Sequence, residues 1–328
     1  MQQYDCDTLI ATAPPFSVLL TCCDICAQFN LKFIPDFRDA WSQWVITPYA
    51  SYIHYRMTLY YERKILKQAY KIITATPQLK NDFLEVHPNI QENKFSVILN
   101  SISSEIKYLS FDKIKNKFII GYVGSFYYNP VSHCLIYSNW WKKKAYQWVQ
   151  YVPRKENWFY RSPYFFFKII NELFDHNPSL KEKVFFYYVG NTPDWLIEMV
   201  NNFKLNKNVL FLGFKPKDQV RKFIEKCDAM LATSIKIENS RDYCIAGKTF
   251  DYLAAGKPII AVVNNGDQKD MLLKSGTSII LDPDDKINSS KELLTLIENR
   301  SSFNPNYQYI KSFRAEENTK LLANLINS

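Results

Sequence analysis

A lysine and a carboxylate three residues apart, Lys248 and Asp251, are the strongest chemical signal in this sequence. They open a short helix predicted within RDYCIAGKTFDYLAAGKPIIA, residues 241–261, after a polar turn and before an apolar strand. Free N–H groups and the helix dipole favour an anion at such a helix start, and Lys248 adds a full positive charge. A diphosphate suits Lys248 and ribose hydroxyls suit Asp251, so the pair predicts a nucleotide site. The alternative is a surface lysine beside an aspartate that only favours the helix start.

Two further positions in the second half of the chain suit a phosphate ligand. Gly124 ends the strand in GYVGSFYY, where a residue without a side chain would let a ligand approach the backbone. Arg161 precedes Ser162 and Pro163, which suit the N-cap and the first position of a helix, so we expect its guanidinium at a helix amino terminus. An ordinary strand-end glycine and a solvent-exposed arginine are the alternatives.

Charged residues also follow a strand in the first half, in IPDFRDAW, residues 34–41. Asp36, Arg38 and Asp39 would emerge at the carboxyl end of that strand, facing a cleft. One carboxylate would act on a hydroxyl of a second substrate, and Arg38 would neutralise a neighbour or bind phosphate. The alternative is an Asp–Arg pair that only ties the loop.

The elements that must position these residues alternate regularly between strand and helix from residue 118 onward. Continuous apolar strands joined by helices of about ten residues are typical of parallel βαβ units with both sheet faces covered. Six strands are predicted there, which makes a doubly wound, Rossmann-like domain. They lie in KFIIGYVGSF, VFFYYVGN, VLFLGF, DAMLATS, KPIIAVV and SIILD.

The first hundred residues predict part of a similar domain. Its strands lie in DTLIATA, LKFIPDF, KIITAT and FSVILNS, with helices between them, one of which is expected around TLYYERKILKQAY. Only six residues precede the first strand and four strands make a thin sheet, so we expect this domain to be incomplete. The prediction is an α/β protein with two Rossmann-like domains facing a cleft. Residues 1–104 form the partial first domain, 105–117 a linker, 118–310 the second domain, and 311–328 a helix that packs back on the first domain.

An aromatic and basic insertion, the flap at residues 137–160, interrupts the second domain after its first strand. It carries four tryptophans (Trp140, Trp141, Trp148 and Trp158) and the run Lys142 to Lys144. A flap packed on its own core, contact with a lipid surface or a sugar, and binding of single-stranded nucleic acid remain open. We expect no nucleic acid, because no recognised nucleic-acid module accompanies the flap.

Composition favours a globular protein with an anionic ligand in its second half. The net charge is +9, and the first 110 residues contribute none of it because they hold ten basic and ten acidic residues. All eight glycines lie at or beyond Gly121, so a Gly-rich phosphate loop is excluded from the first 120 residues. The seven cysteines are expected as buried free thiols, although Cys23 and Cys26 have the spacing of a redox or metal pair. No signal sequence or membrane span is predicted, so we expect a cytoplasmic protein.

These motifs resemble the group 1 glycosyltransferases, retaining enzymes of the GT-B fold that use nucleotide-sugar donors. The resemblance is carried by the alternation from residue 118, by KTFDYLAAGKPIIA and by the DFRDAW loop. It implies a donor site in the second domain, an acceptor site in the first, and no metal cofactor. By position, Asp251 matches a glutamate that binds the donor ribose, Lys248 a lysine on the phosphate side, and Gly124 the glycine of the first turn.

The sequence also departs from the family pattern. A second family glutamate corresponds to Tyr243, with Asp242 adjacent, and the basic residue that often follows the first-turn glycine is Ser125. We therefore expect Arg161 to supply that charge. The acceptor-side candidates are Asp36, Arg38 and Asp39, and no metal ligands are assigned. The expected donor-binding residues are Gly124, Ser125, Arg161, Asp242, Gly247, Lys248, Thr249 and Asp251.

The resemblance implies sugar transfer, with retention, to a hydroxyl acceptor in bacterial surface polysaccharide or lipid-linked glycan synthesis. The partners would be a nucleotide sugar, a glycan or lipid-linked acceptor, and, through the flap, the inner face of the cytoplasmic membrane. One rival is a GT-B nucleotide-sugar epimerase, which needs no acceptor. Another is a non-catalytic remnant that binds nucleotide or a partner and transfers nothing.

Overall fold

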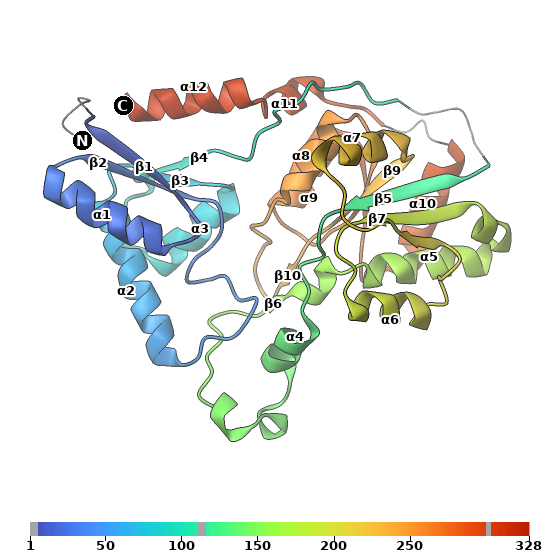
Figure 1. Cartoon of the computed structure of the whole chain (residues 1–328), viewed down its shortest axis with the longest axis horizontal. Coiled ribbons are helices and arrows are strands. Elements are labelled where there is room, and N and C mark those ends of the chain that lie inside the picture. Colours follow the sequence, from blue (N-terminus) through green and yellow to red (C-terminus); the bar gives the residue numbers. More distant parts are fainter. Residues whose placement is uncertain (1–5, 111–115, 300–302, 328) are drawn as a thin grey trace.

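The computed structural model describes residues 6–110, 116–299 and 303–327 and contains two α/β domains (Figure 1). Residues 111–115 of the predicted linker lie outside the described residues, as do residues 1–5 and Ser328 at the two ends. The first domain is a parallel sheet in the order β1-β2-β3-β4, covered by helices. Its strands are β1 (Thr8–Ala13), β2 (Lys32–Phe37), β3 (Ile72–Thr74) and β4 (Phe95–Val97), and its helices are α1 (Ser17–Phe29), α2 (Tyr52–Gln68), α3 (Pro77–Val86) and the 3-10 turn η1 (Glu92–Lys94).

The second domain has a six-stranded parallel sheet in the order β12-β11-β9-β5-β7-β8. Its strands are β5 (Phe118–Val123), β7 (Val184–Val189), β8 (Val209–Phe211), β9 (Ala229–Thr233), β11 (Ile259–Val262) and β12 (Ser278–Leu281). Strands β9 and β11 are buried along their whole length, as continuous apolar strands covered on both faces should be. The predicted α/β fold with two Rossmann-like domains is confirmed.

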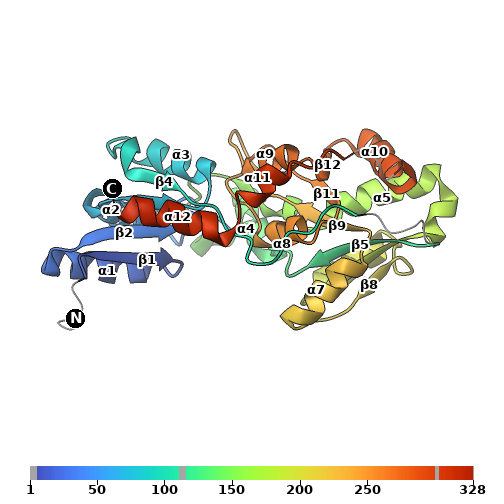
Figure 2. The same ribbon diagram turned by 90° about the horizontal axis from the view of Figure 1, so that it is seen from above.

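Helices cover both faces of this second sheet (Figure 2). The chain builds β5, β7 and β8 outward on one side, then returns to place β9, β11 and β12 on the other. The strand order therefore reverses between β5 and β9, which is where ligands of such sheets bind. The covering helices are α5 (Tyr164–His176), α6 (Asp194–Asn202), α7 (Lys217–Lys226), α8 (Gly247–Ala254), α9 (Asp267–Ser275) and α10 (Lys286–Asn299), with the turn η5 (Pro178–Glu182) after α5.

The carboxyl-terminal segment crosses back to the first domain, where α12 lies along the sheet (Figures 1 and 2). Ile102 forms a parallel bridge with Arg314, and Asn318 donates from its side chain to the Leu99 carbonyl at 2.7 Å. Leu325 packs in a buried apolar cluster with Ile34 of β2, Ile73 of β3 and Ile98, which follows β4. The segment consists of α11 (Tyr307–Lys311) and α12 (Ala315–Ile326).

The flap between β5 and α5 is folded and reaches the first domain. Tyr151 forms an antiparallel bridge with Tyr49, and β6 pairs with β10 in a short two-stranded ribbon. Helix α5 begins at Tyr164, whose N–H donates to the Ser162 hydroxyl at 3.3 Å, so Ser162 caps the start of this helix as predicted, with Pro163 between them. The flap elements are α4 (Pro130–Tyr137), the turns η2 (Trp140–Lys142), η3 (Ala145–Gln147) and η4 (Trp158–Arg161), and β6 (Glu156–Asn157), whose partner is β10 (Lys236–Ile237).

All seven cysteines are free thiols. Cys23 and Cys26 are buried on α1, but Cys6 and Cys134 are exposed, so burial was predicted correctly for only some of them. Among the helices of the described residues, none combines the length and the apolar character that crossing a bilayer would require.

Candidate active site between the two domains

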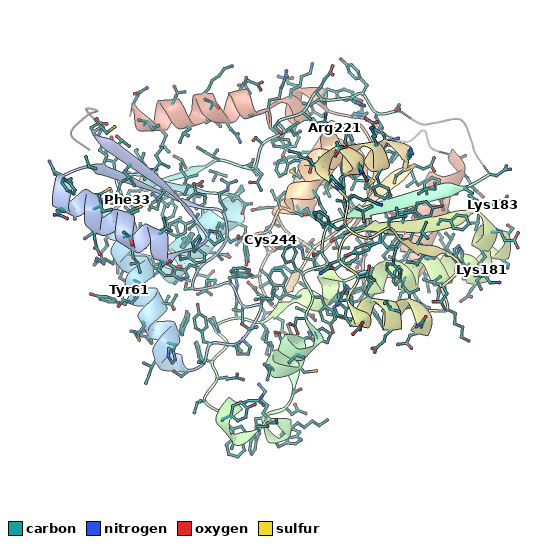
Figure 3. All side chains as sticks on the ribbon, viewed as in Figure 1. Phe33, Tyr61, Lys181, Lys183, Arg221 and Cys244 are labelled. Atoms are coloured by element: carbon teal, nitrogen blue, oxygen red, sulfur yellow. The ribbon has the colours of Figure 1, made fainter. Side chains whose placement is uncertain are left out.

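A pocket of about 570 Å³ lies between the domains, at the carboxyl ends of strands from both sheets. Cys244, which lines it, lies midway between the two domains in Figure 3. The first domain contributes residues that directly follow β1, β2 and β3, and the second contributes the flap base and the segment before and into α8. The lining residues are Pro14, Arg38, Asp39, Trp44, Ala75, Thr76, Asn100, Tyr127, Trp158, Arg161 and Tyr243 to Lys248.

Lys248 stands in the first turn of α8 and enters the pocket beside the end of β5. Its Nζ lies 3.7 Å from the centre of the Tyr122 ring and 3.5 Å from the Ser125 carbonyl oxygen. Gly124 has a φ of +87°, and a Cβ there would lie 3.4 Å from the same Nζ. Burial, and then the charge of Arg161, hold the pKa of Lys248 well below its ordinary value. An ammonium in such surroundings gains from an anion that enters the pocket.

Arg161 is the second cation of the pocket, and it is almost fully buried, at 8% exposure. It ends the turn η4 and lies three residues before Tyr164, the first residue of α5, close to the expected helix amino terminus. Its guanidinium carbon lies 5.2 Å from the Tyr127 ring centre and 5.6 Å from the Trp158 ring centre. Among the described residues no carboxylate lies within ion-pair distance of Arg161, and these two aromatic faces pack against its charge.

Two predicted donor ligands instead hold the loop that leads into α8. Asp242 is 1% exposed and accepts from the backbone N–H groups of Cys244, at 2.7 Å, and Ile235, at 3.2 Å. Burial raises the pKa of Asp242 to about 7. The Thr249 side chain is completely buried, and its hydroxyl donates to Gln268 at 3.4 Å. The structure therefore brings neither Asp242 nor Thr249 side chain to the pocket, whereas Gly247 lines it with open space at its Cα.

Asp251 lies one helical turn beyond Lys248 but lines a separate hollow of about 210 Å³. Lys217 and Arg221 of α7 line the same hollow, and Figure 3 shows Arg221 on that helix. Burial raises the pKa of the Asp251 carboxyl, while the charges of Lys217 and Arg221 lower it less. Lys248 and Asp251 are thus about 4.5 Å apart along the axis of α8. Their side chains line two different cavities, the interdomain pocket and the neighbouring hollow.

The three acceptor-side candidates have three different roles in the structure. Asp36 accepts from Arg38 at 3.2 Å and from the Thr12 hydroxyl at 3.1 Å, and it does not line the pocket. Arg38 lines the pocket and is anchored by donating to Asn100 Oδ1 at 2.6 Å. Asp39 lines the pocket too, and burial raises its pKa although Arg161 and Arg38 oppose the rise. Asp39 is therefore the acid of this group that faces the space in front of the two cations.

A cluster of charged residues between the two domains was not predicted from the sequence. Arg154, in the last part of the flap, contacts Asp82 Oδ2 of α3 at 2.5 Å and Glu156 Oε1 at 2.7 Å. Glu156 is 0% exposed and also accepts from the Val45 N–H of the first domain at 3.0 Å. The Arg154 guanidinium lies 4.7 Å from the ring centre of Tyr243, which lines the pocket. The cluster therefore holds the two walls of the pocket together.

Backbone contacts join the same walls closer to the pocket. The Thr76 hydroxyl, after β3, donates to the Tyr243 carbonyl at 2.7 Å. The Gln78 N–H in α3 donates to Asp267 Oδ2 of α9 at 2.7 Å. These two contacts could not be predicted from the sequence, because the partners of each are far apart along the chain and have no distinctive local pattern.

Comparison with known proteins agrees with this geometry. The model of the family "Glycosyl transferases group 1" matches residues 167–314. No curated protein sequence is significantly similar to the chain. The structure of HepE from Anabaena, solved with UDP and glucose, superposes with a TM-score of 0.64 at 14% identity, over 97% of this chain and 77% of that one.

Two further solved structures share the fold. Sucrose-phosphate synthase from Thermosynechococcus elongatus has a TM-score of 0.65 at 12% identity, over 99% of this chain and 74% of that one. A protein from Listeria monocytogenes named as a candidate UDP-N-acetylglucosamine 2-epimerase has a TM-score of 0.51 at 11% identity, over 97% and 73% of the two chains. The chain therefore has the GT-B fold, and residues 167–314 of its second domain are similar to the group 1 glycosyl transferases.

Proposed function

We propose that the chain transfers a sugar, with retention of anomeric configuration, from a nucleotide-sugar donor to a hydroxyl acceptor. The observation that carries this proposal is the pair of cations, Lys248 and Arg161, that line one interdomain pocket. The pair lies where the strand order reverses, beside Gly124 and the start of α8. A diphosphate would give these two cations an anionic ligand.

The donor would lie along α8. Lys248 and Arg161 would hold the diphosphate, and Gly124, Ser125 and Gly247 would leave room for it at the backbone. Asp251 would accept from the ribose hydroxyls in the neighbouring hollow, close to Lys217. UDP is the first nucleotide to test, because the HepE structure holds UDP.

The two cations would act mainly as the bond to the leaving group breaks. The bond from the sugar's anomeric carbon to the diphosphate breaks, and a bond to the acceptor oxygen forms on the same face of the sugar. The acceptor's proton passes to the departing diphosphate oxygen, which Lys248 and Arg161 stabilise. We propose that these fixed charges make a metal cofactor unnecessary. Asp39 and Arg38, across the pocket, would orient the acceptor hydroxyl.

The acceptor would be a glycan or lipid-linked glycan of bacterial surface polysaccharide synthesis, and the enzyme would act in the cytoplasm. A lipid-linked acceptor would bring the protein to the inner face of the cytoplasmic membrane. A second candidate, nucleotide-sugar epimerisation, is supported by the structural likeness to the Listeria protein.

A turnover assay with and without acceptor separates the candidates. The wild-type chain is incubated with a panel of nucleotide sugars and acceptors, and products are identified by NMR. Transfer predicts that nucleoside diphosphate is released only when an acceptor is present, and that the new linkage keeps the donor's configuration. An inverted linkage would overturn retention. Altered sugar formed without acceptor would instead identify an epimerase, and nucleotide binding with no turnover on any pair would identify a non-catalytic binder.

A further inference from the structure

The exposed aromatic residues of the flap lie at its tip, outside the interdomain pocket. Trp140, Trp141, Tyr146 and Trp148 are each between 58% and 68% exposed, and Val149 is 64% exposed. Large apolar side chains seldom gather on a surface in this number unless the surface meets a partner. The base of the flap is different, because Trp158 is buried and lines the pocket. Of the earlier alternatives, a flap packed on its own core is therefore wrong for the tip.

Helix α2 of the first domain extends this surface. It begins at Tyr52, six residues before the stretch in which sequence predicted a helix, and this extra turn carries part of an exposed stripe. Ile53, Met57 and Tyr60, spaced along one helix face, are 70%, 49% and 66% exposed. The helix and the flap are joined where the Tyr52 ring lies 4.9 Å from the Tyr151 ring. Figure 1 shows α2 and the flap along the same lower edge of the molecule.

The charges of this surface have one sign. Residues 113–155 contain no Asp or Glu, and the flap tip carries Lys142, Lys143 and Lys144. The only acid of α2 is Glu62, which is completely buried by His87 and Ser42, whereas the basic residues Arg56 and Arg63 are exposed. An anionic partner fits such a surface.

A hollow of about 360 Å³ beside α4 combines both features on a smaller scale. Val131 and Leu135 line it on the helix side, and Lys142 and Lys143 line it from the flap tip. An apolar wall under two ammonium groups suits a phosphate headgroup attached to an acyl chain.

We infer that the flap tip and the exposed face of α2 together form a surface that binds an anionic lipid bilayer. Tryptophan and tyrosine would lie at the level of the headgroups, with lysine and arginine on the phosphates. Single-stranded nucleic acid also pairs aromatic and basic groups, but Val149, Ile53 and Met57 have no ring on which a base could stack. In a membrane, these aliphatic side chains would be buried in the acyl-chain region.

This inference deepens the proposed function by giving a lipid-linked acceptor a route to the pocket, yet it can be tested without any sugar transfer. The test is co-sedimentation of the purified chain with vesicles of phosphatidylcholine alone or mixed equally with phosphatidylglycerol. We expect binding to the mixed vesicles, a blue shift of tryptophan fluorescence on binding, and weakening as salt is raised. Little binding is expected to phosphatidylcholine alone.

Three sets of variants locate the surface. Trp140→Ala/Trp141→Ala/Trp148→Ala should weaken vesicle binding at least tenfold, and Lys142→Gln/Lys143→Gln/Lys144→Gln should weaken it on the order of 100-fold. Ile53→Ser/Met57→Ser/Tyr60→Ser on α2 should also weaken it several-fold. The charge control is Lys181→Gln/Lys183→Gln/Lys207→Gln, which removes three exposed lysines from other parts of the surface and should leave binding unchanged. Figure 3 shows Lys181 and Lys183 at the far end of the second domain.

Several results would overturn the inference. Absence of binding to the mixed vesicles would do so, as would equal loss in the lysine set and its control. Unchanged binding in the α2 set would refute the two-segment surface. Binding of RNA or of a soluble glycan without vesicle binding would assign the surface to that partner instead. Each variant is also melted with and without UDP, because a nucleotide response that survives loss of vesicle binding separates this surface from the proposed donor site.

Discussion

Replacement of Arg154 by methionine tests whether the charge cluster holds the two domains together. Methionine keeps much of the length of the side chain but removes the charge between Asp82, which is 3% exposed, and Glu156, which is 0% exposed. Removing one partner of a buried ion pair costs about 3 to 5 kcal/mol, because the remaining charge stays buried without compensation. Asp82 keeps a hydrogen bond from Gln78 and Glu156 keeps those from Val45 and Trp158, so we expect the lower part of this range, about 3 kcal/mol.

The assay is urea unfolding at pH 7, followed by tryptophan fluorescence. The matched control is Lys155→Met at the neighbouring position, where Lys155 Nζ lies 3.6 Å from Glu238 and both side chains are about half exposed. Such a surface pair contributes little, so the control should lose less than about 0.5 kcal/mol. Because Arg154 links two domains, Arg154→Met should also separate unfolding into two transitions.

A loss below about 1 kcal/mol for Arg154→Met, or a loss equal to that of the control, would refute this account. A further check uses acid. The difference between Arg154→Met and wild type should shrink as pH falls towards 4, because burial raises the pKa of Glu156, and a protonated Glu156 no longer needs a cation. A difference that stays the same down to pH 4 would mean that the lost stability comes from packing rather than from charge.

Three other predictions concern the buried acid Asp242, two glycines at positive φ, and the pocket lysine Lys248. Burial raises the pKa of Asp242 to about 7, so the folded state binds the proton more tightly than the unfolded state, and stability must fall as pH rises. Between pH 5 and 8 wild type should lose about 2 to 3 kcal/mol relative to Asp242→Asn in urea titrations. Gly256→Ala should destabilise the fold by more than about 2 kcal/mol, because the new Cβ would lie 2.5 Å from the Tyr108 carbonyl oxygen. Gly213→Ala, also at positive φ but with no atom near the new Cβ, should cost about 1 kcal/mol. Thermal unfolding measures both losses. Burial and the charge of Arg161 lower the pKa of Lys248, so this lysine should lose its charge at a pH below the usual lysine pKa. UDP affinity should therefore fall as pH rises through that range. Calorimetry should find no such fall for Lys248→Ala.

The fold was predictable because the strands of the second domain are continuous runs of apolar residues in the sequence. Strands β9 and β11 have no polar face, and that pattern occurs in parallel sheets covered on both sides. The position of the pocket was predictable for the same reason, because ligands of parallel sheets bind at the carboxyl ends of the strands. Lys248 and Arg161 were found in this way.

The direction of each side chain was harder to predict. Lys248 and Thr249 are adjacent in sequence, but α8 turns one into the pocket and the other onto Gln268. Asp242 was expected to bind the donor because it is an acid near the motif, yet two backbone N–H groups already occupy its oxygens. Whether such a side chain reaches the pocket depends on tertiary contacts, which the sequence does not reveal.

The flap was difficult for a related reason. Its tip and base have the same aromatic composition, but Arg154 and Glu156 bury the base against the first domain and leave the tip exposed. The first turn of α2 was missed because the Ser51 hydroxyl that caps the helix, by accepting from the His54 N–H, resembles any loop serine.

Calorimetric titration of UDP into wild type and Lys248→Ala tests the central claim most directly. A charge-assisted hydrogen bond to phosphate is worth about 1.5 to 3 kcal/mol, so Lys248→Ala should bind UDP about 10-fold to 150-fold more weakly than wild type. Lys207→Ala, which removes an exposed lysine elsewhere on the second domain, should bind like wild type. Equal affinity in wild type and Lys248→Ala, or no binding of any nucleoside diphosphate to wild type, would contradict the assignment of this pocket as a nucleotide-sugar site.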